Sequence, residues 1–431
     1  MWRNTLARVD VLSEDEVELV HRHAMTILEE IGVDFLHPRA VELFEDAGMA
    51  VEGDRVRFDP DWVMSQAARV PPLFQVRARG AGRAVTIGGD HMVNAPVHGP
   101  PFVTDLDRGR RGATIEDFTN FDRLSQAVPQ IHCAGGTTVE PEDLPLATRH
   151  LDMVYSHLRW TDKPFMGSVI SAGRARDSIA MAAIALGGRE RIEATPAILA
   201  LVDVNSPLRY DERMLGALLE YAEANQPVVV TPFLMAGAAP PMGLAQQFAE
   251  ALAGIALIQV VRPGAPCVLG SVPDGRAGSA AFGTPASALG ILAGAQMARR
   301  YRIPFRGGGA LTSSGSPDAR AAYESMLCLW PTVLGGVHLV VHAAGLLESA
   351  QLASYEKFAI DVEMLRTFEW MLERGALHEA GPCAPTADGA AHERWKRMLA
   401  EYEDPGIDPG VDEELRRFMA TRTEQIAREP A

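Results

Sequence analysis

Asp203 and His342 are the side chains in this sequence that are best suited to acid and base chemistry. Asp203 follows a predicted strand at residues 197–202, with Asn205 close behind, and His342 follows another at 337–341, with Glu348 further on. Side chains beyond the carboxyl ends of parallel strands face one site. We therefore predict His342, Asp203 and Glu348 as catalytic residues. Asn-Ser-Pro is also good turn chemistry, and His342 could instead have a structural role.

Other common reaction signatures are missing. The glycine runs at 135–136 and 307–309 lack the GxxxxGK[ST] pattern of a phosphate loop and the GxGxxG pattern of a dinucleotide fold. They indicate tight turns or close backbone approaches, with ligand contact at Gly308 as the alternative. No GxSxG motif is present. His338 and His342 lie on a strand and the loop after it, so they do not share a helical face as zinc-binding pairs do, and no metal site is predicted.

Eight strands alternating with eight helices would position these residues. The strands are expected near Phe102 and at residues 131–134, 165–169, 197–202, 228–231, 267–270, 303–307 and 337–341. Amphipathic helices are expected at residues 115–126, 144–160, 174–186, 211–224, 244–261, 285–301, 317–330 and 355–374. This alternation is typical of a (β/α)8 TIM barrel, and a doubly wound open sheet is the alternative.

The barrel is flanked by two further segments. Residues 1–98 are predicted as an N-terminal cap domain of helices and short strands, which begins with a capping box at Ser13 and Glu16. Residues 99–375 form the barrel, and residues 376–431 form a proline-containing helical tail.

Composition excludes several classes of protein. The 40 basic and 56 acidic residues give a net charge of −16, which disfavours nucleic acid and anionic membranes as partners. The four cysteines are widely spaced, as expected of reduced thiols. No apolar run is expected to reach the 18 to 20 residues of a spanning helix. We therefore predict a cytoplasmic enzyme, and a homo-oligomer is the usual expectation at this size.

Several longer motifs together resemble the trimethylamine:corrinoid methyltransferase family over roughly residues 12–375. They are LSEDEVELVHRHAMTILEEIGVDF near the N-terminus, NSPLRYDERML after the fourth strand, TPFLMAGAAPPMGLAQQFAEALAGI after the fifth, SGSPDARAAYES after the seventh, and VHLVVHAAGLLES with SYEKFAIDVEML after the eighth. The resemblance implies a TIM barrel that moves a methyl group from a methylated amine to the cobalt of a separate corrinoid protein. It implies no tightly bound cofactor on this chain.

One departure moves the expected substrate. Family members that act on trimethylamine carry pyrrolysine, whereas this sequence contains only the twenty standard residues. The resemblance is therefore to the pyrrolysine-free branch, which uses quaternary amines such as glycine betaine. A quaternary ammonium already has a neutral amine as its leaving group, so its demethylation needs positioning and desolvation more than acid catalysis.

A quaternary cation has no N–H to donate, so we expect it to contact aromatic faces and a carboxylate. Arg306 is expected to pair with a betaine carboxylate, with Arg209 or Arg276 as alternatives. For each aromatic candidate, a place in the hydrophobic core is the alternative. The predicted substrate-binding residues are Phe102, Asn205, Phe233, Phe282, Arg306, Gly308 and Tyr355.

Three other functions remain open from the sequence. A barrel lyase or hydrolase would use His342 and Asp203 as acid and base. Methyl transfer could go directly to tetrahydrofolate. A chain that kept the barrel could also bind a small molecule without catalysis.

Overall fold

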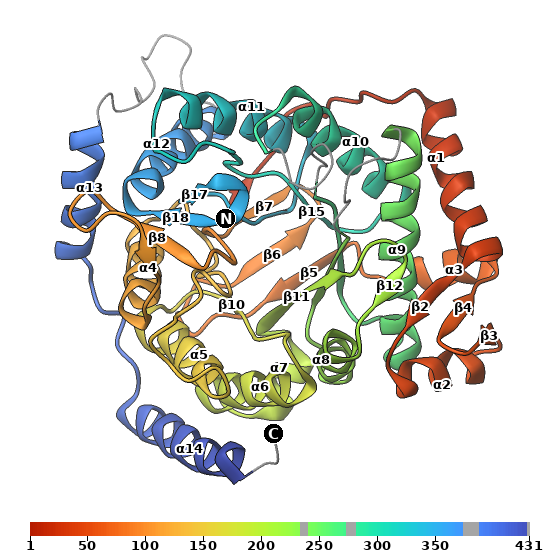
Figure 1. The fold of residues 1–431 in the computed structure, drawn as a ribbon, viewed down its shortest axis with the longest axis horizontal. Helices are drawn as coiled ribbons and strands as arrows, with labels where there is room; N and C mark the ends of the chain where they lie inside the picture. Colours follow the sequence, from red (N-terminus) through yellow and green to blue (C-terminus); the bar gives the residue numbers. More distant parts are fainter. Residues whose placement is uncertain (233–239, 273–281, 374–387, 429–431) are drawn as a thin grey trace.

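The computed structural model describes residues 1–232, 240–272, 282–373 and 388–428, and at its centre is a barrel of parallel strands (Figure 1). Hydrogen bonds join the strands in the order β10-β11-β13-β14-β15-β16-β7, and each pair in this series is parallel. These strands are β7 (His91–Asn94), β10 (Phe165–Met166), β11 (Ile198–Val204), β13 (Val228–Pro232), β14 (Cys267–Gly270), β15 (Phe305–Arg306) and β16 (Leu339–Val340).

The segment at residues 132–135 closes the barrel between β7 and β10. On one side, the amides of His132 and Cys133 donate to the carbonyl oxygen of Asn94 in β7. On the other, Ala134 donates to Pro164, and Met166 in β10 donates to Gly135. With this extended segment, eight stretches of chain complete the (β/α)8 barrel that the sequence predicts.

The identity of the first barrel strand was predicted wrongly. Phe102–Thr104 is strand β8, which pairs with β18 (Leu352–Ser354) and β9 (Arg111–Gly112) outside the barrel. The first barrel strand is β7, because its residues Val93 and Asn94 pair with β16. β7 therefore lies within the residue range of the predicted cap, while the division into cap, barrel and tail stays a prediction.

Helices follow the strands and cover the barrel's outer face (Figure 1). Most begin at a residue whose side chain accepts a backbone N–H of the first turn, such as Thr114, Ser171, Asp211 and Asp318. The helices are α4 (Ile115–Ala127), α5 (Arg149–Trp160), α6 (Ala172–Leu186), α7 (Arg189–Ala194), α8 (Glu212–Glu223), α9 (Pro240–Val261), α10 (Pro285–Tyr301), α11 (Ala319–Gly335) and α12 (Tyr355–Leu372).

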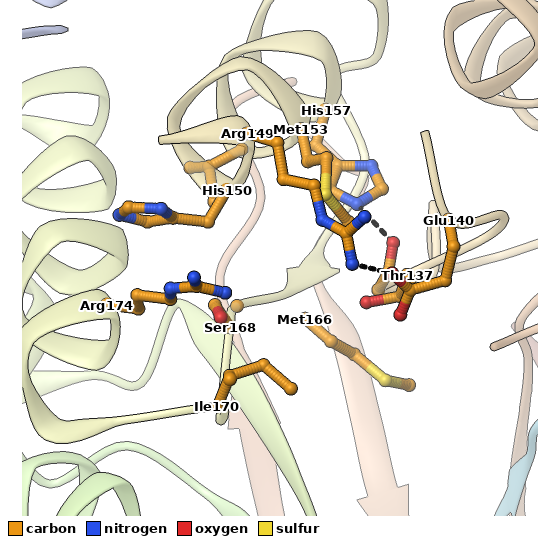
Figure 2. A pocket seen from close by; sticks show the side chains of 13 residues that line it. Thr137, Glu140, Arg149, His150, Met153, His157, Met166, Ser168, Ile170 and Arg174 are labelled. Carbon is orange, nitrogen blue, oxygen red and sulfur yellow. Dashed lines mark hydrogen bonds and ion pairs between the residues drawn. The ribbon is translucent and has the colours of Figure 1, made fainter. Parts of the chain in front are cut away.

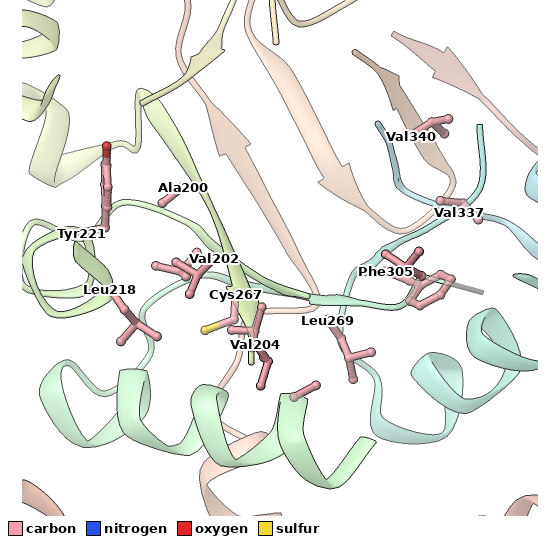
Figure 3. Close-up of a cluster of buried hydrophobic side chains, with 14 of the residues drawn as sticks. Ala200, Val202, Val204, Leu218, Tyr221, Cys267, Leu269, Phe305, Val337 and Val340 are labelled. Carbon is pink, nitrogen blue, oxygen red and sulfur yellow. The ribbon is translucent and has the colours of Figure 1, made fainter. Parts of the chain in front are cut away.

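The two-residue period of the strands separates the barrel interior from the layer beneath the helices. In β11, Ala200 and Val202 belong to the outer cluster, which also contains Leu269 and Phe305 (Figure 3). Leu199 and Leu201 belong to the inner cluster, with Val229 and other inward side chains. By the same alternation, Asp203 faces inward at the carboxyl end of β11.

Secondary structure before the barrel forms two units. The first contains α1 (Glu14–Thr26), the π-helix η1 (Ile27–Ile31), α2 (Pro38–Asp46) and α3 (Pro60–Ala67), with strands β2 (Val33–Phe35), β3 (Ala50–Glu52) and β4 (Arg55–Arg57). It packs against α9, and β2 pairs with β12 (Arg209–Tyr210). The second is a hairpin of β5 (Leu73–Val76) and β6 (Val85–Gly88), whose buried side chains join the inner cluster of the barrel. The short strand β1 (Trp2–Arg3) pairs with β7.

The prediction that no apolar segment is long enough to span a membrane is wrong for helix α9. Within the described residues, Met242–Val261 meets the length and composition of a spanning helix, with a mean hydropathy of 1.5. However, 78% of that segment is buried inside the protein. The apolar sequence follows from this position, because α9 lies between the barrel and the N-terminal helices α1 and α3.

A small sheet and two helices complete the chain. The sheet has the order β17-β18-β8-β9, with β17 at Leu346–Leu347 and the one-turn 3-10 helix η2 at Glu348–Ala350. Helix α13 (Asp388–Ala400) packs on α12 and α4, and α14 (Pro409–Arg428) packs on α6 and α5.

Candidate functional site

A cavity of about 330 Å³ lies at the carboxyl ends of the barrel strands. Barrel enzymes bind their substrates at this end. Its walls come from several strands, from the loops that follow them, and from the turn after β17. The lining residues are His98, Gly99, Thr137, Glu140, Met166, Gly167, Ser168, Val169, Ile170, Leu201, Asp203, Met214, Ser271, Val272, Phe282, Arg306, Gly308, Leu311, His342, Ser349, Ala350 and Gln351.

Asp203 places a carboxylate in this cavity from the end of β11. Burial raises its pKa to about 6, although the guanidinium of Arg306 acts in the opposite direction. Its Oδ1 atom is buried and has no hydrogen-bond partner among the residues that the structure describes. A buried carboxylate oxygen without a partner is costly, so the geometry favours a ligand that supplies positive charge.

Arg306 places the opposite charge in the same cavity. Burial lowers its pKa to about 10, and the carboxylate of Asp203 partly offsets this effect, so the guanidinium stays protonated at neutral pH. Its buried Nε has no hydrogen-bond partner in the described parts of the chain. The two side chains do not form an ion pair with each other, so each keeps capacity for a ligand.

His342 presents a neutral imidazole beside Arg306. Its pKa lies well below the ordinary value because of burial, and the charges of Arg306 and His98 lower it further. The backbone N–H of His98 donates to Nδ1 of His342 over 3.2 Å. In the neutral ring the proton is therefore on Nε2, which makes that nitrogen a donor.

Phe282 supplies an aromatic face to the cavity, and it is only 3% exposed. Apolar side chains from other strands and loops accompany it, namely Met166, Leu201, Val272 and Leu311. The cavity thus combines an apolar part with two carboxylates, Asp203 and Glu140, one guanidinium, Arg306, and two histidines, His98 and His342.

Five of the predicted site residues line this cavity together. They are Asp203, Phe282, Arg306, Gly308 and His342. Gly308 has a left-handed φ of 61°, and a Cβ there would lie 1.9 Å from Oγ1 of Thr332, so close backbone approach also explains this glycine. Phe233 and the alternative Arg276 lie outside the described residues.

Four predicted site residues lie elsewhere among the described residues. Asn205 is exposed and accepts the backbone N–H of Asp211 over 3.0 Å, as a turn residue would. Tyr355 is buried in the core, where its hydroxyl donates to Asp117 over 2.9 Å. Phe102 lies in β8, and its ring is covered by the guanidinium of Arg110 at 4.6 Å.

Glu348, the fourth, forms an ion pair with Arg110 and is not among the residues that line the cavity. The alternative Arg209 is more than half exposed and pairs with Asp34 on the N-terminal unit. These side chains are therefore held by contacts outside the cavity.

His98 is a cavity residue that the sequence reasoning missed. It follows β7, and burial lowers its pKa to about 4, with Arg306 and His157 adding to the effect. Its Nδ1 is buried and no described residue forms a hydrogen bond with it. Had residues 91–94 been recognised as the first barrel strand, His98 would have been selected by its position after a strand end.

A smaller depression adjoins the cavity and shares Thr137, Glu140 and Met166 with it (Figure 2). Arg149 contacts the Glu140 carboxylate there, so its charge is already paired. The depression measures about 30 Å³, which is the space of about one water molecule. It extends the rim of the cavity without forming a separate ligand site.

The described residues contain no group of three or more His, Cys, Asp or Glu side chains arranged to hold a metal ion. The described cysteines, Cys133, Cys267 and Cys328, are buried, and burial raises the pKa of each thiol to about 12. They behave as small apolar core residues.

The chain matches a known family and several characterised enzymes. Residues 1–387 and 376–427 match the family model described as trimethylamine methyltransferase (MTTB). The glycine betaine methyltransferase of Desulfitobacterium hafniense is 39% identical, with 98% of this chain and 99% of that protein covered. The proline betaine:corrinoid methyltransferase of Eubacterium limosum is 29% identical, with 96% and 92% covered.

The fold comparison agrees with the barrel topology. The crystal structure of the Methanosarcina barkeri monomethylamine methyltransferase superposes with a TM-score of 0.57 at 10% sequence identity. The superposition covers 97% of this chain and 89% of that one.

Proposed function

The chain belongs to the trimethylamine methyltransferase family, and from this premise we propose that it removes a methyl group from a betaine-type quaternary amine. The acceptor in this proposal is the cobalt(I) of a corrinoid carried by a separate protein, and the name of the proline betaine relative, which includes a corrinoid, supports this choice. Glycine betaine is the substrate we favour, because the glycine betaine methyltransferase is 39% identical over nearly the whole chain.

The observation that carries this proposal is the pair of unpartnered, opposite charges in one cavity. Within the described residues, Asp203 has a carboxylate oxygen and Arg306 a guanidinium nitrogen without a hydrogen-bond partner. A betaine is a zwitterion, so its quaternary ammonium can contact Asp203 and Phe282 while its carboxylate contacts Arg306. The Nε2–H of His342 would donate a further hydrogen bond to that carboxylate.

In the proposed reaction, the cobalt(I) supplies the electron pair of the new bond to carbon, and the C–N bond breaks with its pair on nitrogen. The amine leaves neutral, so the protein does not need to protonate it. The contribution of this chain is to desolvate the cation, hold it by both charged ends and direct one methyl group toward the barrel mouth. Asp203 and Arg306 fix the orientation of the substrate, and Phe282 excludes water from the ammonium.

A direct assay tests this proposal. The protein is incubated with glycine betaine and a cobalt(I) corrinoid, and methylation is followed by absorbance while dimethylglycine is measured separately. We expect both products with the wild-type chain and neither when Asp203→Asn and Arg306→Met are combined. Failure with glycine betaine, proline betaine and carnitine alike would overturn the proposal.

Other outcomes of the same assay identify the rival functions. Methyl transfer to tetrahydrofolate without a corrinoid would support the direct route. Turnover of a substrate without any methyl acceptor would support a lyase or hydrolase that uses Asp203 and His342, for which the raised pKa of Asp203 is the favouring observation. Ligand binding without a product would indicate a binding protein.

For its surroundings we propose a cytoplasmic enzyme that forms a homo-oligomer and holds no cofactor tightly. The burial of α9 within the protein supports an aqueous location. The corrinoid partner would have to approach the carboxyl face of the barrel, because the cavity lies at that end.

A further inference from the structure

The turn after β17 has an unusual backbone and forms part of the cavity wall. Glu348, Ser349 and Ala350 have φ angles of 48°, 51° and 72°. Three successive residues with a Cβ in the left-handed region are rare, because the side chain crowds the backbone there. Ser349 and Ala350 line the cavity, and so does the next residue, Gln351.

Contacts outside the cavity hold this turn in place. The backbone N–H groups of Glu348 and Ser349 donate to the carbonyl oxygens of Ser314 and Thr312, over 2.9 and 3.0 Å. The carboxylate of Glu348 accepts hydrogen bonds from Arg110 through both of its oxygens. A strained conformation persists only where its surroundings fix it in this way.

Arg110 is itself held by the small sheet. It lies in the loop between β8 and β9, and its guanidinium sits 4.6 Å from the centre of the Phe102 ring. Phe102 pairs with Leu352, at the start of the strand that follows the turn. Arg110 and Glu348 thus lie in turns next to the neighbouring strands β8 and β18 of one sheet, which brings them together across 238 residues of sequence.

We infer that Arg110 is a positioning residue, which acts through Glu348 to keep the left-handed turn in the conformation that walls the cavity. This inference assigns to Glu348 a role in shaping the site. The inference depends on the proposed function in one respect, because it assumes that the cavity binds the substrate. Without the ion pair, the turn would relax toward ordinary backbone angles and withdraw Ser349 and Ala350 from the substrate.

Kinetics of Arg110→Ala provide the first test. We expect KM for glycine betaine to rise about fivefold, the upper range for a partly exposed ion pair, with kcat and Tm nearly unchanged. Glu348→Gln should give the same rise, and the double variant should be no worse than either single one. Adding Ser349→Gly to Arg110→Ala should restore much of the KM, because glycine adopts positive φ without strain.

Arg189→Ala is the matched control, since Arg189 also forms an exposed ion pair, with Glu193 on α7, away from the cavity. It should leave KM unchanged. Additive effects of Arg110→Ala and Glu348→Gln, or no rescue by Ser349→Gly, would overturn the inference.

Hydrogen exchange separates this inference from the proposed function, because it needs no substrate. The amides of Glu348 and Ser349 should exchange faster in Arg110→Ala than in the wild-type chain or in Arg189→Ala. If no quaternary amine is turned over, the proposed function fails and exchange decides the inference alone. Unchanged exchange of both amides would contradict it.

Discussion

At the residue scale, the candidate site depends on two charged groups, each of which has one buried atom without a hydrogen-bond partner among the described residues. Asp203 and Arg306 lie in one cavity without forming an ion pair, and each has a buried atom free for a ligand. Leaving such groups unsatisfied costs folding free energy. A zwitterionic ligand such as a betaine would recover part of that cost by pairing with both groups.

Binding should depend on pH through Asp203. Its pKa of about 6 lies above the ordinary value of 3.8, so the carboxylate is ionised at pH 7.5 and largely protonated at pH 5. Only the ionised form attracts the ammonium, so affinity should fall as pH decreases through about 6, by up to about tenfold per unit. Calorimetric titration with glycine betaine checks this, and Asp203→Asn should bind weakly and without the pH dependence. The same strong affinity at pH 5 would contradict the role of Asp203.

Arg306 should select for the carboxylate of the substrate. In Arg306→Met, the dissociation constant for glycine betaine should rise about 10- to 100-fold, as expected when a charged hydrogen-bond donor is lost. Choline carries the same cation without the carboxylate, so its weaker binding should change little. Equal losses for both ligands would show that Arg306 supports the cavity wall and does not contact the carboxylate.

At the element scale, buried contacts position the loops that carry the site. Lys357 and Asp361 form an ion pair within α12 that is fully buried, and Asp361 also accepts the backbone N–H of Gly345 over 2.8 Å. Gly345 belongs to the turn that follows His342. The ion pair therefore connects α12, the last barrel helix, to the turn that follows His342.

Replacing Lys357 with methionine should be strongly destabilising at neutral pH. It leaves the Asp361 carboxylate buried without its partner, which costs about 3–5 kcal/mol. Burial already raises the pKa of Asp361 to about 6, above its ordinary 3.8, so the folded state binds this proton more tightly than the unfolded state. The loss should therefore be smaller at pH 5 than at pH 7.5 in urea unfolding. A double variant with Asp361→Leu should recover part of the stability, and an equal loss at both pH values would contradict this assignment.

Gly308 should not tolerate a side chain. An alanine there would meet Oγ1 of Thr332 in α11 and would also adopt a left-handed backbone, so we expect a loss of about 1–3 kcal/mol or more. Gly53→Ala is the control, because Gly53 has a similar φ of 63° and a Cβ there would have nothing within 4 Å. Thermal unfolding should show a clearly larger fall in Tm for Gly308→Ala. Equal falls would mean that backbone strain alone explains the glycine.

Most elements could be predicted from local patterns, and the exceptions have non-local causes. The helices after each strand follow from periodicity and capping residues such as Asp211 and Asp318. The first barrel strand could not be recognised this way, because His91–Asn94 is chosen by pairing with β16, far along the chain. Phe102–Thr104 has equally good strand composition but pairs outside the barrel.

At the scale of the whole molecule, barrel closure brings the site together. Asp203 and His342 were selected from the sequence by their places after predicted strands, and Arg306 was selected as a partner for a betaine carboxylate. The barrel brings all three to one cavity, because it collects the carboxyl ends of its strands at one end. The placement of Tyr355 and Glu348 could not be found in this way. Their positions depend on Asp117 and Arg110, whose distance along the chain exceeds the reach of any local pattern.

The N-terminal unit also belongs to this organisation. It covers α9, and its strand β2 pairs with β12. Strand β12 follows the loop after Asp203. In that loop, Ser206 and Leu208 donate to the buried carboxylate of Glu250 on α9. The loop after Asp203 is thus held by α9, the helix that the N-terminal unit covers.

A single-turnover experiment tests the proposed transfer of a methyl group from glycine betaine to a corrinoid. The protein is mixed with glycine betaine that carries labelled methyl groups and with an equal amount of a cobalt(I) corrinoid, in the absence of folate. We expect labelled methyl on the corrinoid and dimethylglycine in equal amounts. Dimethylglycine that forms without labelled corrinoid, or no dimethylglycine from a properly folded chain, would contradict it.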